Sequence, residues 1–227
     1  MCGIFGVIDN SNQINKNLFK ISLKKIEHRG PDNSACDFIT NNIAFGHVRL
    51  SIIDLDKSNN QPFVIDNYHL TYNGEIFNYL EIKSELIKLG HKFKTKGDTE
   101  VLLRSYIEWG EKCVTKFNGM WAFSIYDKKK NRLFCSRDRF GIKPFYYFSD
   151  SNRFIFASEI KAIIEYYKNL KKVDYYSLYG YLYLNQGGES ENTWFLNVKR
   201  LLPSHNLIIK NNIIKKKKYW SYPKKIN

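Results

Sequence analysis

The chain begins with Met1-Cys2-Gly3-Ile4-Phe5-Gly6-Val7, and the interpretation of the remaining residues depends on this stretch. Residues 2–8 form an apolar run that predicts a buried strand, in which glycines allow close backbone approach. Removal of Met1 would leave Cys2 with a thiol and a free α-amine, which is the arrangement of an N-terminal nucleophile and its own base. The α-amine titrates at about 8 and a free thiol at about 8.5, so a proton can pass between them. The stretch alone fits a short strand that happens to contain a cysteine equally well.

Length and composition predict a folded protein. The 227 residues are 43% apolar and 16% aromatic, which is enough for a large core. The sequence contains no apolar run of about 18 residues that could span a membrane. No basic segment precedes the first apolar run, so a signal peptide is not expected. We therefore expect a cytoplasmic protein.

The formal net charge of +14 raises the hypothesis of nucleic-acid binding. The basic residues are mostly scattered lysines, and the densest run, Lys215-Lys216-Lys217-Lys218, lies beside Tyr219-Trp220 near the C-terminus. No helix-turn-helix, zinc-finger or aromatic RNA-binding motif accompanies the run. A solvated strand end or linker is the favoured interpretation, and no nucleic-acid partner is expected.

The cysteine pattern favours free thiols in a reducing compartment. No two cysteines form a CxxC pair, and no histidine supplies metal-ligand spacing, so no metal site is predicted. Only the first cysteine has a special location, and the others are interpreted as packing residues. The four positions are Cys2, Cys36, Cys113 and Cys135.

Patterns of hydrophobicity predict many strands flanked by helices, which is typical of an α+β sandwich. Asn41-Asn42 is expected to form a tight turn, and Asp98 to cap the helix that follows it. Helices are expected near 17–27, 78–89, 99–109, 158–168 and 174–184. Strands are expected near 2–8, 34–40, 43–50, 68–72, 120–126, 131–136, 144–148, 153–157 and, as a weak pair, within 205–220.

A series of distinctive motifs follows in order along the chain: Cys2-Gly3-Ile4-Phe5-Gly6, His28-Arg29-Gly30-Pro31-Asp32, His47-Val48-Arg49-Leu50-Ser51-Ile52-Ile53-Asp54, Tyr72-Asn73-Gly74-Glu75-Ile76-Phe77-Asn78-Tyr79, Lys96-Gly97-Asp98-Thr99-Glu100, Gly119-Met120-Trp121-Ala122-Phe123, Arg137-Asp138-Arg139-Phe140-Gly141-Ile142-Lys143-Pro144 and Phe156-Ala157-Ser158-Glu159. In this order and spacing they together resemble the N-terminal glutaminase domain of glutamine-dependent asparagine synthetases, a class II glutamine amidotransferase and N-terminal-nucleophile (Ntn) hydrolase. The resemblance implies a four-layer αββα sandwich of two mainly antiparallel sheets. It assigns residues 2–210 to the amidotransferase domain and 211–227 to the start of a linker toward a synthetase domain that is absent here.

The resemblance implies three catalytic positions. Cys2 would attack the glutamine side-chain amide and form a thioester, with its own α-amine as the base. The tetrahedral oxyanion needs donors aimed at it, and the family supplies the Asn73 side-chain amide and the Gly74 backbone N–H. Taken alone, Asn-Gly favours a hairpin turn, but the succeeding Glu75-Ile76-Phe77-Asn78-Tyr79, which matches the family, reverses that preference.

The resemblance also implies how glutamine is held. Arg49 would bind the carboxylate, for which a guanidinium suits bidentate bonding. Glu75 and Asp98 would bind the ammonium, and backbone groups around Ile52 and Ile53 would complete the pocket. The alternatives are a surface charge for Arg49 and a helix N-cap for Asp98, which can serve both roles.

Other motif residues are given structural roles. His28 and His47 resemble catalytic bases, but the α-amine fills that role, so we interpret both as structural. Residues 137–144 are expected to form an ion-pair and turn element that supports the sheets and lies outside the site. Gln186-Gly187-Gly188-Glu189-Ser190 lacks the leading Ser and the Asp of a pyrophosphate loop, and we expect a plain glycine turn.

The resemblance therefore predicts a glutaminase that supplies ammonia for ATP-dependent amidation of aspartate by a synthetase domain, in cis or in trans. L-Glutamine is the expected ligand, no cofactor is expected in this domain, and ATP and Mg²⁺ are expected only for the synthetase domain. A homodimer stays open, and no membrane partner is expected. Two alternatives are a catalytically silent glutamine-binding or interaction module, which retention of Met1 would favour, and an ammonia donor to another carboxylate such as a sugar acid.

Overall fold

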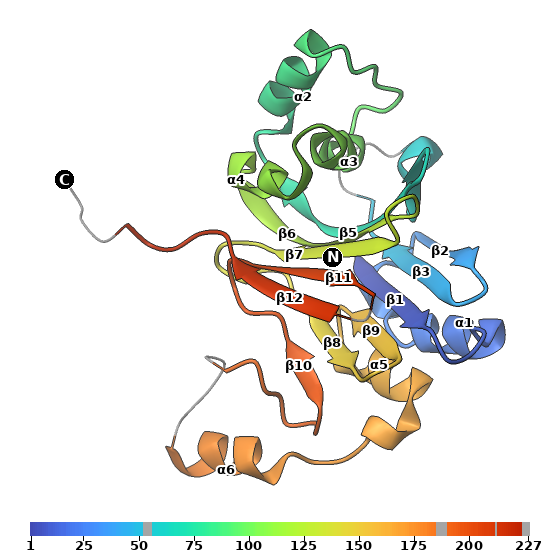
Figure 1. The fold of residues 1–227 in the computed structure, drawn as a ribbon, viewed down its shortest axis with the longest axis vertical. Helices are drawn as coiled ribbons and strands as arrows, with labels where there is room; N and C mark the ends of the chain where they lie inside the picture. The colour runs from blue at the N-terminus through green and yellow to red at the C-terminus, as the bar shows by residue number, and fades with distance from the viewer. Residues whose placement is uncertain (52–55, 185–189, 212, 224–227) are drawn as a thin grey trace.

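Two β-sheets packed face to face, with helices on their outer faces, make up the computed structural model (Figure 1). The structure describes residues 1–51, 56–184, 190–211 and 213–223. Two of the predicted binding residues, Ile52 and Ile53, lie outside the described residues, as do Gly187 and Gly188 of the expected glycine turn.

The first sheet has the N-terminal strand near its centre. This strand, β1, is buried along its whole length and pairs antiparallel with β3 on one side and β9 on the other. A strand with neighbours on both sides and packing on both faces requires a nearly continuous apolar run, which residues 3–8 supply. In the described part of the chain the strand order is β10 (Val198–Arg200), β8 (Tyr146–Ser149), β9 (Arg153–Ala157), β1 (Gly3–Asp9), β3 (Ile43–Arg49) and β2 (Asn33–Thr40).

The second sheet is also antiparallel and is built around β5 and β6, which pair from Tyr68 with Asp127 to Ile76 with Gly119. At its far edge β12 pairs with β11, so the sheet continues to Lys218, and the boundary expected at residue 210 stays a prediction. Within the described ranges the order is β12 (Ile213–Lys218), β11 (His205–Lys210), β7 (Arg132–Arg137), β6 (Gly119–Asp127), β5 (Tyr68–Ile76) and β4 (Phe63–Ile65).

Helices cover the outer face of each sheet. Residues of α1 (Lys16–Lys24) and α5 (Ile160–Tyr166) pack in one cluster with residues of the first sheet. On the second sheet, α2 (Tyr79–Lys88) and α3 (Asp98–Trp109) take the same position, followed by the short α4 (Cys113–Lys116). Short 3-10 helices are η1 (Glu27–Arg29), η2 (Lys57–Asn59), η3 (Gly110–Lys112) and η4 (Lys168–Leu170).

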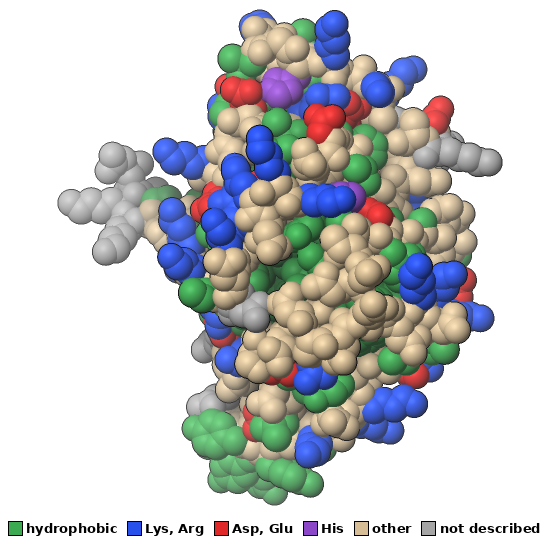
Figure 2. Space-filling model, turned by 45° about the vertical axis from the view of Figure 1, so that its right-hand side comes forward, with side chains coloured by type: hydrophobic (Ala, Val, Ile, Leu, Met, Phe, Trp, Pro, Cys, Tyr) green, Lys and Arg blue, Asp and Glu red, His purple; other side chains and the backbone are tan. Residues whose placement is uncertain are grey.

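Charged and hydrophobic side chains are distributed differently over the surface. Figure 2 shows Lys and Arg side chains spread from one end of the visible face to the other. Hydrophobic side chains gather at the end of the molecule where α6 (Tyr175–Leu184) lies, and Tyr176 there is 84% exposed. None of the helices in the described ranges has the length and apolar character needed to cross a membrane.

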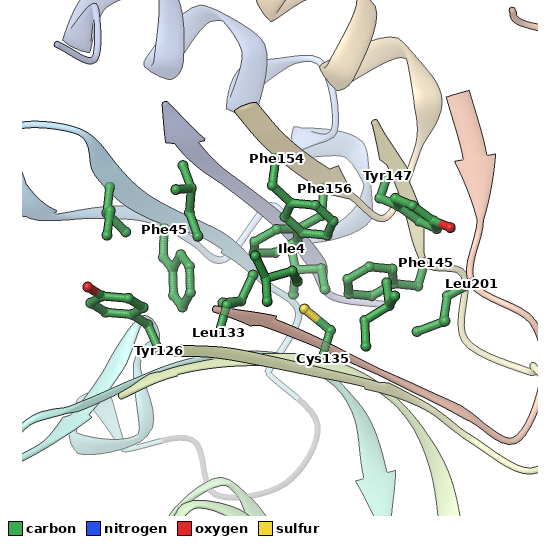
Figure 3. Packing of buried hydrophobic residues seen from close by; sticks show 14 of the residues in the cluster. Ile4, Phe45, Tyr126, Leu133, Cys135, Phe145, Tyr147, Phe154, Phe156 and Leu201 are labelled. Carbon is green, nitrogen blue, oxygen red and sulfur yellow. The ribbon is translucent and has the colours of Figure 1, made fainter. Parts of the chain in front are cut away.

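An apolar layer joins the two sheets (Figure 3). Ile4, Phe45 and Phe156 from the first sheet meet Leu133 and Cys135 from the second, and all five are essentially buried. With helices outside both sheets, the layers follow the order helix, sheet, sheet, helix. The predicted αββα sandwich is therefore confirmed.

Two buried hydrogen bonds also connect the sheets, both between β3 and β5. The ring Nε2–H of His47 donates to the Tyr72 carbonyl (3.0 Å), and the Thr71 hydroxyl donates to the Gly46 carbonyl (3.1 Å). The other ring nitrogen of His47 is buried and has no hydrogen-bond partner among the described residues. Burial lowers the pKa of His47 from 6.5 to about 3, so the ring is neutral at physiological pH.

The structure corrects local predictions. Asp98 does not cap α3, because the N-cap is Gly97 and the Asp98 carboxylate accepts hydrogen bonds from β5 instead. The strand expected at 68–72 is longer: β5 extends to Ile76 and pairs with β6 throughout, so Asn73-Gly74 lies inside it and forms no turn, in agreement with the interpretation based on the family motif. The short elements β4, β10 and α4 were not predicted, because three or four residues carry too little periodicity.

We predict that His47 makes the stability of the protein pH-dependent. Between about pH 3 and 6.5 the unfolded state binds a proton at His47 that the folded state does not, so stability falls as the pH falls through this window. Acidification from pH 7.5 to 5.5 should cost the wild type about 1 kcal/mol more than His47→Gln, whose amide replaces the donor but does not titrate. Urea unfolding of both proteins at both pH values measures the difference, and equal losses would contradict the prediction.

Candidate active site

A cavity of about 100 Å³ brings the predicted site residues together. It lies beside the start of β1, between residues of the first sheet and the β5 strand of the second. Each predicted site residue that the structure describes contributes to its wall. The lining residues are Met1, Cys2, Arg49, Leu50, Asn59, Gln61, Tyr72, Asn73, Gly74, Glu75, Asp98, Thr99, Met120 and Lys143.

The backbone of Cys2 is held by side chains from other parts of the chain. Arg29 donates its Nε–H to the Cys2 carbonyl (3.0 Å) and forms an ion pair with Glu159 (3.1 Å). Ile4, the second residue of β1, forms two hydrogen bonds with Ser158. The Ile4 N–H donates to the Ser158 hydroxyl (3.0 Å), and the Ser158 backbone N–H donates to the Ile4 carbonyl (2.9 Å). The start of the strand is therefore fixed on both sides, which fixes the origin of the Cys2 side chain.

The Cys2 thiol lies against the backbone of Leu50, with Sγ 3.5 Å from the nitrogen and 3.6 Å from the carbonyl oxygen. Burial raises the pKa of the thiol above its usual value. The Leu50 N–H and the positive charges of the Met1 ammonium, Arg49 and Lys143 lower the same pKa. Desolvation therefore opposes ionisation of the Cys2 thiol, whereas the nearby positive charges favour it.

One edge of β5 presents backbone donors to the cavity. Along a strand, alternate N–H groups point to the same edge. On the edge away from β6, the Tyr72 N–H donates to Gln61 Oε1 (2.6 Å) and the Ile76 N–H donates to Asp98 Oδ2 (3.0 Å). The Gly74 N–H lies between these two donors and points to the same edge. A methyl group at Gly74 would overlap the Met120 carbonyl, so only glycine fits there.

Asn73 supplies a second donor to the cavity. Its side chain is on the opposite face of β5 from Tyr72 and on the same face as Thr71, which bonds to the first sheet. The residue is 1% exposed, and its Nδ2 has no hydrogen-bond partner in the described part of the chain. Buried amide donors are almost always paired in folded proteins, so this group marks a position for a ligand acceptor.

The cavity also contains charges of both signs. Arg49 is 6% exposed, and its Nη1 donates to the Asp56 carbonyl (3.0 Å) and to Asn60 Oδ1 (2.7 Å). Asp98 Oδ2 accepts from the Tyr72 hydroxyl (2.8 Å) as well as from the Ile76 N–H, and burial raises the Asp98 pKa. Glu75 completes the acidic side.

The two histidines in the motifs lie outside the cavity wall. His28 contacts Glu159 (2.9 Å) on the surface side of Arg29, and His47 lies between the sheets. Both placements agree with structural roles. The remaining cysteines, Cys36, Cys113 and Cys135, do not line the cavity either. Within the described ranges, His, Cys, Asp and Glu side chains form no group of three that could hold a metal ion.

Several polar residues of the cavity wall were not predicted as site residues. Two of them, Tyr72 and Thr99, adjoin predicted site residues within the motifs. Asn59 and Gln61 belong to a segment that the sequence predicted only as a polar loop. Lys143 belongs to the segment 137–144, which was expected to lie outside the site, and this expectation is wrong. The sequence does show a lysine directly after a glycine-containing turn. This local pattern does not indicate toward which part of the fold the turn points, so it could not place Lys143 in the site.

Comparisons with known proteins agree with this geometry. The model of the family described as "Glutamine amidotransferase domain" matches residues 1–220. "Putative asparagine synthetase [glutamine-hydrolyzing] 2" of Methanocaldococcus jannaschii is 39% identical, over 98% of this chain and 47% of its own length. "Asparagine synthetase [glutamine-hydrolyzing] 3" of Bacillus subtilis is 37% identical, over 97% of this chain and 37% of its own length. The chain thus spans less than half the length of these curated relatives.

A solved structure shares the fold. Glutamine phosphoribosylpyrophosphate amidotransferase from B. subtilis superposes with a TM-score of 0.71 over 96% of this chain and 49% of that chain, at 19% identity. The two antiparallel sheets with flanking helices match the Ntn-hydrolase fold, as predicted. The family match and the identities establish kinship beyond the fold: the chain belongs to the glutamine amidotransferase domain family and is related to the asparagine synthetases.

Proposed function

We propose that this chain releases ammonia from the side chain of glutamine, with Cys2 as the nucleophile. The observation that carries the proposal is the unpartnered, buried amide of Asn73 in the same cavity as the Cys2 thiol. A buried donor without an acceptor costs free energy, and an oxyanion formed on a substrate carbon next to Cys2 would accept from it. The Gly74 N–H is the second donor to the same oxygen.

The reaction has two stages. Once Met1 has been removed, the α-amine of Cys2 takes the thiol proton, and Sγ attacks the amide carbon of glutamine. The carbon–nitrogen bond breaks, the proton passes from the amine to the departing nitrogen, and ammonia leaves a γ-glutamyl thioester. Water then attacks the thioester, which releases glutamate and restores the thiol. The sum consumes one glutamine and one water and gives one glutamate and one ammonia.

The charges in the cavity fit a free amino acid. Arg49 is proposed to bind the α-carboxylate, since a planar guanidinium matches a carboxylate. Glu75 and Asp98 are proposed to bind the α-ammonium. Backbone groups around Ile52 and Ile53 stay a prediction of the family resemblance. The cavity should therefore bind an amino acid that has an α-carboxylate, an α-ammonium and a side-chain amide more tightly than a simple amide.

The ammonia is proposed to serve an amidation reaction. The names of the curated relatives contain both "asparagine synthetase" and "glutamine-hydrolyzing", and this chain spans 37–47% of their length. We therefore propose aspartate as the final acceptor and a synthetase part, in cis or in trans, as the partner. ATP and Mg²⁺ would belong to that part, and no cofactor is proposed for this domain. Another carboxylate, such as that of a sugar acid, is the alternative acceptor.

A second candidate function depends on whether Met1 is removed. With Met1 in place, the nitrogen of Cys2 is part of a peptide bond and Met1 itself lines the cavity. A chain that retains Met1 lacks the base and would bind glutamine without turnover. Intact-mass spectrometry of the purified protein distinguishes the two forms, and the turnover hypothesis requires the form that lacks Met1.

Cys2→Ala should abolish ammonia release. We expect the rate with glutamine to fall by more than about a thousandfold, since the variant has no nucleophile to form the thioester. Coupled detection of ammonia and glutamate measures the rate, and Cys36→Ala is the matched control because Cys36 does not line the cavity. Equal rates in wild type and Cys2→Ala would contradict the proposal.

Asp98→Asn should weaken glutamine binding. The amide can still accept from Tyr72 and Ile76, so the local structure is retained while the charge opposite the ligand ammonium is lost. We expect KM for glutamine to rise by roughly tenfold to a hundredfold, because a hydrogen bond to a charged group contributes about 1.5–3 kcal/mol. Steady-state kinetics provide the test, with the surface variant Asp150→Asn as control. An unchanged KM would remove Asp98 from the binding site.

A further inference from the structure

Lys143 is a cation of the cavity to which the proposed glutamine contacts assign no role. The residue is 7% exposed and lines the same cavity as Cys2. The ion pairs formed by the described residues do not include it. A largely buried ammonium without a paired carboxylate is unfavourable, so its retention calls for a compensating interaction.

The loop before Lys143 is rigid, so the position of the lysine is set by the backbone. Asp138 accepts from the N–H groups of Phe140 (3.0 Å), Ile142 (2.9 Å) and Lys143 (3.0 Å). Arg137 donates to the carbonyls of Lys143 (2.8 Å) and Gly141 (2.7 Å). The carboxylate and the guanidinium thus hold both sides of the loop. The segment that was expected only to support the sheets fixes the origin of the Lys143 side chain beside the cavity.

The proposed contacts pair each charge of glutamine with a charge of the cavity. Arg49 binds the carboxylate, and Glu75 and Asp98 bind the ammonium. Lys143 then has no partner on the substrate. The remaining group that becomes negative during the reaction is the Cys2 sulfur, followed by the oxyanion. Burial lowers the pKa of Lys143 below its usual value, and the negative charges of Cys2, Asp138 and Glu75 act against this effect. Lys143 in turn lowers the pKa of Cys2. The two groups are therefore electrostatically coupled.

We propose that Lys143 is an electrostatic partner of Cys2 in the glutaminase reaction, a role that rests on the proposed function. Its ammonium stabilises the thiolate before attack and the negative charge that develops after attack, without donating or accepting a proton. Fixed charges are effective here because the loop is already organised and little reorganisation accompanies the reaction.

Alkylation of Cys2 tests the proposal without glutamine turnover. The rate of carboxamidomethylation by iodoacetamide, followed by peptide mass spectrometry at Cys2, is measured from pH 5 to 10 for the wild type, Lys143→Met, Lys143→Gln and Lys143→Arg. The neutral variants should shift the midpoint upward by about one unit, which makes alkylation roughly tenfold slower near pH 7. Lys143→Arg should keep the wild-type midpoint. The other charged groups that line the cavity or hold Cys2 are the N-terminal amine, Arg29, Arg49, Glu75 and Asp98, and they are the same in all of these proteins.

Lys116→Met is the matched control, because Lys116 pairs with Glu85 on the surface (2.7 Å) and lies outside the cavity wall. It should leave the midpoint unchanged. Unchanged midpoints in both neutral variants would overturn the proposal, as would an equal shift in Lys143→Arg, which would indicate shape instead of charge. Far-UV circular dichroism verifies that each variant is folded. If one neutral variant does not fold, the other still tests the proposal. Absence of ammonia release from the wild type would refute the proposed function while the alkylation result for Lys143 stands separately.

Discussion

The arrangement of the site depends on two buried hydrogen bonds between the sheets, from His47 to the Tyr72 carbonyl and from Thr71 to the Gly46 carbonyl. Apolar packing holds the sheets together but has little directional preference, whereas these bonds fix how far β3 can slide along β5. Cys2 is attached to the first sheet and Asn73 belongs to the second. Their common cavity therefore exists only at one relative position of the sheets, which polar groups define at the cost of burying an imidazole.

Within the cavity, too, polar side chains form contacts that organise the site instead of the contacts that their local sequence favours. Asp98 does not take the capping role that its position would suggest, and the N-cap of α3, Gly97, provides no side-chain hydrogen bond. In exchange, its carboxylate holds Tyr72 and the end of β5. Among the described residues, the Asn73 amide likewise lacks a hydrogen-bond partner, and Lys143 forms no ion pair. Local stability is sacrificed at the positions where a ligand with matching charge and hydrogen-bonding groups would restore it.

Sequence reasoning located most of the site and the fold class, because the motifs have a characteristic order and the strands have clear apolar patterns. It failed where long-range contacts decide. Asp98 has the local preference of a helix N-cap, and its hydrogen bonds with Tyr72 and Ile76 override that preference. The turn before Lys143 was predicted, but its closeness to Cys2 follows from sheet packing, which no local pattern encodes. Asn59 and Gln61 had no periodic signal at all.

The position of β1 between β3 and β9 has a consequence for biosynthesis. Cys2 emerges from the ribosome among the first residues, but the strand that follows it obtains its second neighbour only when Arg153–Ala157 has been made. The ion pair of Arg29 with Glu159 comes later still. The strand can pair with β3 once Ile43–Arg49 has been made, but its other edge stays open for about another hundred residues, and pairing with β9 then closes a long loop. The reactive end is translated first, yet it obtains its full set of neighbours only after residue 159 has been made.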